Sequence, residues 1–343
     1  MDVSNINMWQ TIGHDKAIVT LKRSLALGRL SHAYLLAGPR HVGKMTLAID
    51  LAKAVNCPER PPPCGKCIQC TRIDRQLHAD LQVVSVENSG STGGRGRVAI
   101  GIDRVREIQR DVSMKPYEGS HRVFIFKEAE HMSEEAANSL LKVLEEPPSQ
   151  VLLLLLVSNT EALLPTIVSR CQLLDLRPLA RDLISSELED KHGVDPVKAD
   201  EIARLSKGKL GWAIKAADGP GLLDELNEKV EFFRDIVAAG LEERFTYAAT
   251  LASSTARDRD VGRQELESWL LWWRDVLLVE HGARDYVMNV SNLEMFRTVA
   301  ASMRSGQIPK AISSINRALE QIENNGNPRL VLEMLMLNLP RLL

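Results

Sequence analysis

The chain has 343 residues, enough for two to three domains, and its 43 basic and 45 acidic residues give a formal net charge of −2. This balance excludes a protein that binds nucleic acid through a strong overall positive charge, although it leaves room for a local basic surface. Because the longest apolar run, Val151–Val157, is too short for a bilayer and the N-terminus lacks a secretory signal, we expect no membrane contact and a cytoplasmic protein with reduced thiols.

Helical and strand patterns alternate along the first half of the chain. Apolar residues at helical spacing predict helices over 14–27, 45–55 and 102–111. Short apolar runs predict buried strands over 33–37, 81–86, 123–126 and 151–157. A polar Gly/Ser/Arg loop is expected at 88–97. This alternation predicts a parallel sheet with helices on both faces.

The second half has a different pattern, without long β-branched runs after Leu176. Helices are expected over 181–192 and 198–205, a linker at 218–221, and amphipathic helices from there to the C-terminus. The predicted fold class is therefore α/β plus all-α, in three domains. These are an α/β domain over 1–177, a small helical domain over 178–219 and a helical domain over 220–343.

The sequence GPRHVGK at 38–44 matches the GxxxxGK pattern of a phosphate loop. It follows a predicted strand and precedes a predicted helix, which is the context that the motif requires. Gly38 and Gly43 would let backbone N–H groups surround an anion, and Lys44 would reach the β- and γ-phosphates. We interpret this segment as a candidate nucleotide-binding loop.

One residue of this loop does not fit the chemistry of ATP hydrolysis. The position after Lys44 normally carries Ser or Thr, whose hydroxyl binds Mg²⁺, but here it is Met45. A thioether is a poor ligand for a hard cation. Thr46 is no substitute, because the next helical position points about 100° away. The sequence therefore predicts no Mg²⁺ site and weak or absent ATP binding.

Four of the five cysteines form the pattern C-x₆-C-x₂-C-x₂-C within 57–70. In a reducing compartment, such a cluster favours metal binding over disulfides. Four thiolates complete a tetrahedral zinc shell, which predicts a structural zinc site with the ligands Cys57, Cys64, Cys67 and Cys70. An iron–sulfur cluster and four buried free thiols are the alternatives. His78 is interpreted as a structural histidine with satisfied hydrogen bonds rather than a further ligand.

Longer motifs stand in a fixed order along the chain. They are RLSHAYLLAGP at 29–39, MKPYEG at 114–119, NSLLKVLEEPP at 138–148 and SRC at 169–171. With the four cysteines, they closely resemble bacterial DNA polymerase III clamp-loader subunits, AAA+ proteins of the γ/τ and δ′ types. The specific match covers about residues 9–215, and the rest agrees only in layout.

The resemblance implies an architecture and a set of partners. The sheet domain would be of the AAA+ P-loop type with an inserted zinc module at about 57–70. A helical lid and a C-terminal helical collar would follow it. The collar would join this chain to γ/τ-type and δ-type subunits in a hetero-pentameric ring. Such a ring opens the sliding clamp and places it on primed DNA.

The same resemblance assigns further positions. The acidic motif of the family carries Asp-Glu after an apolar strand, and here that pair is Lys127 and Glu128. Glu128 keeps the place of the general base, whereas the ammonium group of Lys127 would repel the metal. In the lid, an arginine that contacts the γ-phosphate is replaced by Gly211. With Met45, these departures all affect the same metal–phosphate chemistry.

The SRC motif at 169–171 is complete. In the family, its arginine is a finger that enters the nucleotide site of the neighbouring subunit, and such a finger raises phosphoryl-transfer rates about 10³–10⁵-fold. We therefore expect Arg170, with Ser169, to act on a neighbour. An exposed ion pair is the alternative interpretation of Arg170.

Trp269, Trp272 and Trp273 give one helix a bulky apolar face. Such a face belongs either to a domain core or to a subunit interface, and the pattern does not separate the two.

Together, these features predict a δ′-type subunit that does not hydrolyse ATP and that supplies Arg170 to a neighbouring site. The alternatives are an ATP-hydrolysing γ/τ-type motor and a zinc protein that binds DNA by itself. Met45, Lys127 and Gly211 argue against the motor, as does the expected absence of an extended C-terminal tail. The near-neutral charge and the closed set of four cysteines argue against the DNA-binding zinc protein.

Overall fold

The computed structural model describes residues 8–86, 99–219 and 221–342, so the loop expected at 88–97 lies outside the described residues. Contacts divide the chain into two compact units. The first is Met1–Glu187 with Ser206–Ala213, and the second is Leu188–Leu205 with Ile214–Leu343. The three-domain division stays a prediction.

The first unit is built on a five-stranded, fully parallel sheet with the strand order β2-β3-β4-β1-β5. The predicted parallel sheet is confirmed. The fifth strand was not predicted, because it is short and only one of its four residues is buried. The strands are β1 (Ala33–Ala37), β2 (Leu81–Val84), β3 (Arg122–Phe126), β4 (Val151–Val157) and β5 (Gln172–Asp175).

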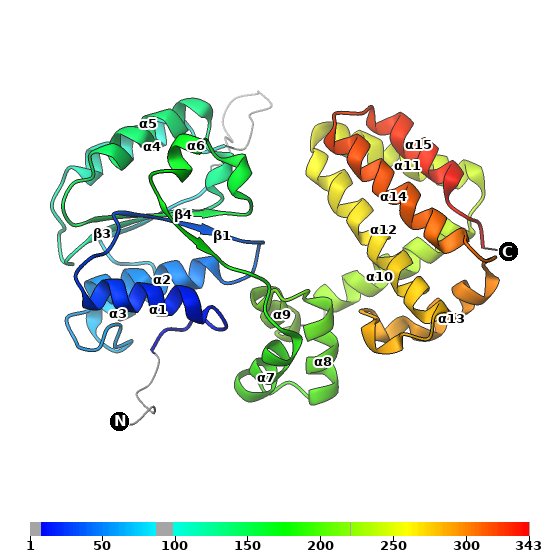
Figure 1. Cartoon of the computed structure of the whole chain (residues 1–343), viewed down its shortest axis with the longest axis horizontal. Helices are drawn as coiled ribbons and strands as arrows, with labels where there is room; N and C mark the ends of the chain where they lie inside the picture. The colour runs from blue at the N-terminus through cyan, green and yellow to red at the C-terminus, as the bar shows by residue number, and fades with distance from the viewer. Residues whose placement is uncertain (1–7, 87–98, 220, 343) are drawn as a thin grey trace. The chain divides into compact units, whose positions relative to one another are not determined.

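Helices cover both faces of the sheet: α1, α2 and α3 lie on one face, and α4, α5 and α6 on the other (Figure 1). Three of them agree with the predicted helices to within a residue at each end, and α3, α5 and α6 were not predicted. Their bounds are α1 (Asp15–Ala26), α2 (Lys44–Asn56), α3 (Ile68–Asp74), α4 (Ile102–Val112), α5 (Glu134–Glu145) and α6 (Pro165–Val168), with short 3₁₀ turns η1 (Ala129–His131) and η2 (Thr160–Ala162).

Alternate side chains of each central strand enter two different cores. In β1, Tyr34 and Leu36 pack with α1 and α2, whereas Leu35 packs with α4 and α5. All seven residues of β4 are buried, so the run Val151–Val157 serves both layers. This two-sided burial is the reason why the strand is continuously apolar rather than alternating.

The second unit is helical. Two helices, α7 (Arg181–His192) and α9 (Leu210–Ala217), have residues in both units. The remaining helices are α8 (Pro196–Leu205), α10 (Gly221–Ala238), α11 (Leu241–Arg257), α12 (Arg259–Glu280), α13 (Leu293–Ser302), α14 (Gln307–Glu323) and α15 (Pro328–Asn338), with 3₁₀ turns η3 (Arg284–Tyr286) and η4 (Val290–Asn292).

The three tryptophans of α12 belong to the core of this unit. Trp269, Trp272 and Trp273 are each at most 1% exposed and pack in one cluster with Phe233 and Phe296. The three tryptophans therefore form part of the core rather than a subunit interface.

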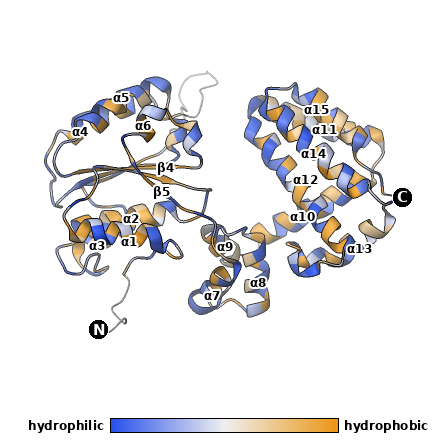
Figure 2. Ribbon diagram, viewed as in Figure 1, coloured by the Kyte–Doolittle hydropathy of each residue, from blue (hydrophilic) through white to orange (hydrophobic). Residues whose placement is uncertain are grey.

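The sheet strands are mainly apolar, and the helices mix apolar with polar residues (Figure 2). Among the residues that the structure describes, no helix has both the length and the apolar character that a membrane span needs.

A buried arginine holds two helix ends together in the second unit. The guanidinium of Arg244, on α11, donates hydrogen bonds to five backbone carbonyls. Ile236 and Val237 supply two of them at the end of α10, and the other three lie at and just after the end of α15, on Met336, Leu339 and Pro340. Helix C-termini leave their last carbonyls without helical partners, so a single side chain serves both ends.

Candidate functional site

The predicted phosphate loop connects β1 to α2, and its two glycines are required by the backbone. Gly38 has φ +150°, and a Cβ atom there would lie 2.2 Å from the carbonyl oxygen of Leu176. Gly43 precedes α2 with φ +115°, in the left-handed region that favours glycine. The loop therefore has the tight strand–turn–helix geometry that the motif predicted.

Lys44 turns back onto the loop that it follows. Its Nζ donates hydrogen bonds to the carbonyl oxygens of Gly38 and Pro39, the second at 3.0 Å. Burial lowers the pKa of Lys44 to about 8, although the negative charge of Glu130 acts in the opposite direction. The cation is therefore engaged by carbonyl groups of its own loop.

Two other residues around the loop have no side-chain group that would bind a metal ion or a phosphate. Met45 packs its side chain against the core between the sheet and α1–α2. Gly211, at the start of α9, donates its N–H to the carbonyl oxygen of His41 at 2.9 Å. A Cβ atom at position 211 would lie 3.1 Å from that oxygen, so the helix approaches the loop closely where it begins.

The acidic segment after β3 lies beside the loop. Glu128 adopts φ +51° and forms an ion pair with Arg40, 2.8 Å between Oε1 and Nη2. One carboxylate oxygen of Glu130 accepts the N–H of Ser158 at 3.0 Å, and the other is buried without a hydrogen bond among the described residues. The sequence reasoning missed Arg40 and Glu130, although both stand inside the two motifs that it used.

Arg170 lies at a different part of the sheet unit, between α6 and β5. Its guanidinium donates hydrogen bonds to Glu145 at 2.7 Å and to the carbonyl oxygen of Thr166 at 3.0 Å. The side chain is 35% exposed, and the Ser169 hydroxyl beside it also bonds Thr166. Among the described residues, the partners of Arg170 are on α5 and α6, and none is in the phosphate loop.

The four cysteines of the predicted metal site come together. Their Sγ atoms all lie within 4.8 Å of one another, and those of Cys57 and Cys67 are 3.9 Å apart. A tetrahedral zinc shell with Zn–S distances of about 2.3 Å has S–S edges of about 3.8 Å. Cys57 directly follows α2, Cys67 caps α3 and Cys70 lies within α3, so helix ends position the cluster. These four residues can hold a structural metal ion.

Backbone N–H groups point at the sulfur atoms of this cluster. Cys64, Cys67 and Cys70 donate their N–H groups to the sulfurs of Cys57, Cys64 and Cys67 at 3.3–3.4 Å. Burial acts to raise the pKa of Cys64, but hydrogen bonds from the backbone of Lys66 and Cys67 outweigh it and bring the pKa down to about 7. Donors of this kind favour the thiolate form, which is the form that binds metal, whereas burial raises the pKa values of Cys57 and Cys70.

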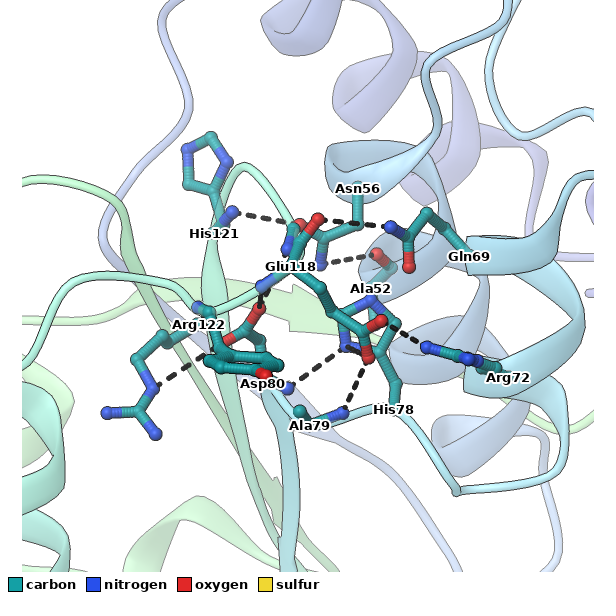
Figure 3. Close-up of polar contacts among 12 residues, drawn as sticks. Ala52, Asn56, Gln69, Arg72, His78, Ala79, Asp80, Glu118, His121 and Arg122 are labelled. Carbon is teal, nitrogen blue, oxygen red and sulfur yellow. Dashed lines mark hydrogen bonds and ion pairs between the residues drawn. The ribbon is translucent and has the colours of Figure 1, made fainter.

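A polar network joins this metal module to the sheet (Figure 3). Asp80 is 2% exposed and accepts the N–H groups of Tyr117, Glu118 and Gly119 at 2.7–2.8 Å. Burial tends to raise the pKa of Asp80, but these three donors outweigh it and hold that pKa below its usual range. The MKPYEG segment is therefore fixed to the start of β2.

Glu118 extends the network to α3. Its carboxylate forms an ion pair with Arg72 and accepts the N–H of Ala79 at 3.1 Å, and its backbone carbonyl accepts the side chain of Gln69. His78 was predicted to have satisfied hydrogen bonds, and only one of its two ring nitrogens has one. Its Nδ1 accepts the N–H of Asp80 at 3.0 Å, but its Nε2 is buried without a hydrogen bond among the described residues.

Known proteins with similar sequences include subunits of DNA polymerase III. The family model described as DNA polymerase III, delta subunit, matches residues 13–180. The chain is 27% identical to the DNA polymerase III tau subunit of Bacillus subtilis, over 94% of this chain and 59% of that protein. It is 26% identical to the delta′ subunit of the same organism, over 93% of this chain and 94% of that protein. A solved DNA polymerase III gamma subunit-related protein from Thermotoga maritima aligns with a TM-score of 0.40 and 19% identity, over 93% of this chain and 97% of that chain.

The chain thus spans about three fifths of the tau relative and nearly all of the delta′ relative. The family match includes the phosphate loop, the cysteine cluster, the acidic segment and the SRC motif. The family match and these relatives show that the chain is similar to the delta′, tau and gamma subunits of DNA polymerase III.

Proposed function

We propose that the chain is a δ′-type subunit of a DNA polymerase III clamp loader and does not hydrolyse ATP itself. The observation that carries this proposal is the state of the phosphate loop. Lys44 bonds two carbonyl oxygens of its own loop, and Met45 packs into the core at the position where hydrolysis needs a metal ligand. Because Mg²⁺ bridges the β- and γ-phosphates in P-loop hydrolysis, a site without its ligands does not support turnover.

The acidic segment supports the same proposal. Lys127 stands where the family has the aspartate that holds the metal, and the ion pair between Glu128 and Arg40 engages the candidate general base. A base must face the attacking water, and here its carboxylate faces a guanidinium instead. Gly211 has no side chain for the γ-phosphate.

The proposed activity of the chain is therefore exerted on a neighbour. Arg170 would leave Glu145 and enter the ATP site of an adjacent γ/τ-type subunit. There, its guanidinium would stabilise negative charge on the transferring phosphoryl group. The present pairing with Glu145 is compatible with this role, because an ion pair with more than a third of its surface exposed contributes only about 0–1 kcal/mol and is easily exchanged.

The remaining assignments follow from this role. The metal in the cysteine cluster would be zinc, and its function would be structural, because four thiolates leave no open position for a substrate. The second unit would join γ/τ-type and δ-type subunits in the ring. The sliding clamp and primed DNA would be bound through the whole complex.

The test is the steady-state ATPase of a reconstituted loader, with the clamp and primed DNA present. We expect Arg170→Ala to leave assembly intact and to remove the share of the ATPase that comes from the one neighbouring site. Lys44→Ala in the same chain should change the rate little. A γ/τ-type motor would show the reverse, with a strong loss for Lys44→Ala.

Arg177→Ala is the matched control, because Arg177 lies close to Arg170 in the sequence, is 85% exposed and pairs only with Asp175 among the described residues. Size-exclusion chromatography should show the same complex for every variant. If Arg170→Ala leaves the ATPase unchanged in an assembled complex, the arginine-finger role is wrong. If the purified chain hydrolyses ATP by itself, the δ′-type assignment is wrong.

A further inference from the structure

A groove runs along the surface of the second unit between α14 and α15, which lie side by side (Figure 1). It has a volume of about 420 Å³ and extends over the turn that joins the two helices. Buried Ala318 and Leu335 form its floor. The groove is distant in sequence from the phosphate loop and the SRC motif, and none of the chemistry described above uses it.

The two walls of the groove differ in chemistry. On α14, Ser314, Arg317 and Gln321 follow one another at helical spacing and present a polar wall. On α15, Leu330 and Met334 form an apolar wall, although they are 62% and 55% exposed. Two large apolar side chains one helical turn apart and open to solvent indicate a surface that a partner covers.

The one charged side chain in the groove lining has no partner among the described residues. Arg317 makes no hydrogen bond and no ion pair with any described residue, and no carboxylate lines the groove. By contrast, the neighbouring Arg329 is paired with Glu333 at 2.8 Å. A guanidinium has five donors and favours a planar carboxylate as partner. The groove therefore has a cation and an apolar wall, each without its complement.

We propose that this groove binds an acidic amphipathic helix of a different polypeptide. The apolar face of the incoming helix would pack on Leu330 and Met334, and a carboxylate on its flank would pair with Arg317. This is the helix-in-groove mode of recognition, in which apolar anchors at i and i+4 supply affinity and a charge fixes the orientation.

A second copy of the chain fits this groove less well. A twofold contact places the same surface on both sides, so the Arg317 side chains of the two copies would approach each other. No carboxylate in the lining would offset this repulsion. The inference stands on this groove alone and does not depend on the arginine-finger role, and its test uses no ATPase measurement.

The probe is a fluorescent synthetic helix of about 18 residues, long enough to fold when bound, with leucines at i, i+4 and i+7 and glutamates on the flank. A second peptide has lysine in place of each glutamate, and a third has serine in place of each leucine. Fluorescence anisotropy with the full chain measures the affinity of each. We expect the glutamate peptide to bind and the other two to bind at least about tenfold more weakly.

Substitutions in the chain make the test specific. Leu330→Ser with Met334→Ser should weaken the glutamate peptide by about tenfold or more. Arg317→Glu should reverse the preference, so that the lysine peptide binds better than the glutamate peptide. Arg304→Glu makes the same charge change at an exposed arginine outside the groove lining, and Leu241→Ser the same polar change at an exposed leucine at the start of α11. Neither control should alter binding.

Circular dichroism of each variant checks the fold, and Arg317→Ala provides a milder change if Arg317→Glu is unstable. Equal binding of the glutamate and lysine peptides, or binding that the groove variants leave unchanged, would overturn the proposal. So would analytical ultracentrifugation that shows a homodimer which Leu330→Ser dissociates, because the groove would then hold a second copy.

Discussion

Arg40 of the phosphate loop and Glu128 of the acidic segment form an ion pair, with 2.8 Å between Nη2 and Oε1. Both side chains are about half exposed, so the pair itself contributes little stability. Its importance is positional, because it joins the loop that would hold phosphates to the residue that would activate water. In the structure, these two groups satisfy each other instead.

This arrangement predicts weak nucleotide binding that does not depend on Mg²⁺, because the oxygen ligands for the metal are missing. Isothermal calorimetry with ATP, with and without Mg²⁺, measures it. Met45→Thr combined with Lys127→Asp returns an oxygen ligand and the metal-binding carboxylate, and we expect Mg²⁺ to increase ATP affinity in that variant. Tight, Mg²⁺-dependent binding by the unmodified chain would contradict the prediction.

The weak binding that remains should depend on pH through Lys44. Burial lowers its pKa to about 8, so the side chain is charged below that pH and neutral above it. Anion affinity should therefore fall as the pH rises through about 8, rather than near 10.5 as for an ordinary lysine. Lys44→Met should bind still more weakly and show no such step. Calorimetry between pH 7 and 9 compares the two proteins.

The metal prediction concerns the cysteine cluster. We expect about one zinc ion per chain, released by Cys67→Ser because three thiolates hold the ion less well than four. Cys171→Ser is the matched control, since Cys171 lies outside the cluster. Atomic emission spectroscopy of protein purified without chelators gives the metal content. Iron in place of zinc would support the cluster alternative, and no metal at all would remove the site.

Asp80 provides a stability prediction for the network beside the metal module. Asp80→Ala leaves three backbone N–H groups without a partner, and each costs about 1–3 kcal/mol, so we expect a loss of at least about 3 kcal/mol. Urea unfolding followed by circular dichroism measures it. Asp103→Ala, at a side chain 91% exposed, should lie within about 0.5 kcal/mol of the parent.

The pH dependence of this effect has a defined sign. The pKa of Asp80 is lowered in the folded state, so its contribution is present above the unfolded pKa of about 3.9 and is lost as the pH falls through the folded value. Asp80→Asn keeps the shape but not the charge. The stability difference between the parent and Asp80→Asn should therefore be constant from pH 5 to 7 and shrink below about pH 4.

Arg244 provides the corresponding test in the second unit. Arg244→Met removes the donors of five backbone carbonyls in a buried place, and we expect a loss of more than about 3 kcal/mol. Arg257→Met, on the exposed side of the same helix, should have little effect. Thermal unfolding followed by tryptophan fluorescence reports on this unit, because Trp269, Trp272 and Trp273 are in its core. Equal midpoints for both variants would contradict the prediction.

The sequence was informative wherever one local pattern decides the structure. The run Val151–Val157 predicted the central strand to the residue, because burial on both faces requires a continuous apolar segment. The cysteine spacing predicted a compact cluster for a similar reason, since short loops leave four thiols few ways to separate. In both cases, the local sequence pattern by itself determines the local structure.

Other features depend on residues that are far apart in the chain. The pairing of Arg40 with Glu128 needs the strand order of the sheet, which no local pattern gives. The sequence does not show which backbone carbonyl groups Arg244 contacts, because every residue has a carbonyl group. Strand β5 was missed since an edge strand with one buried residue has no apolar run.

The close approach of Gly38 to the carbonyl oxygen of Leu176 has a consequence for how such chains change during evolution. Any side chain at position 38 would collide with the main chain at Leu176, just after β5, whether or not a nucleotide is ever bound. Selection for folding alone is therefore enough to keep this glycine, and the left-handed backbone at Gly43 acts in the same direction. Folding by itself can therefore preserve the glycines of a phosphate loop, so positions 45 and 127 are more informative about catalysis than the glycines.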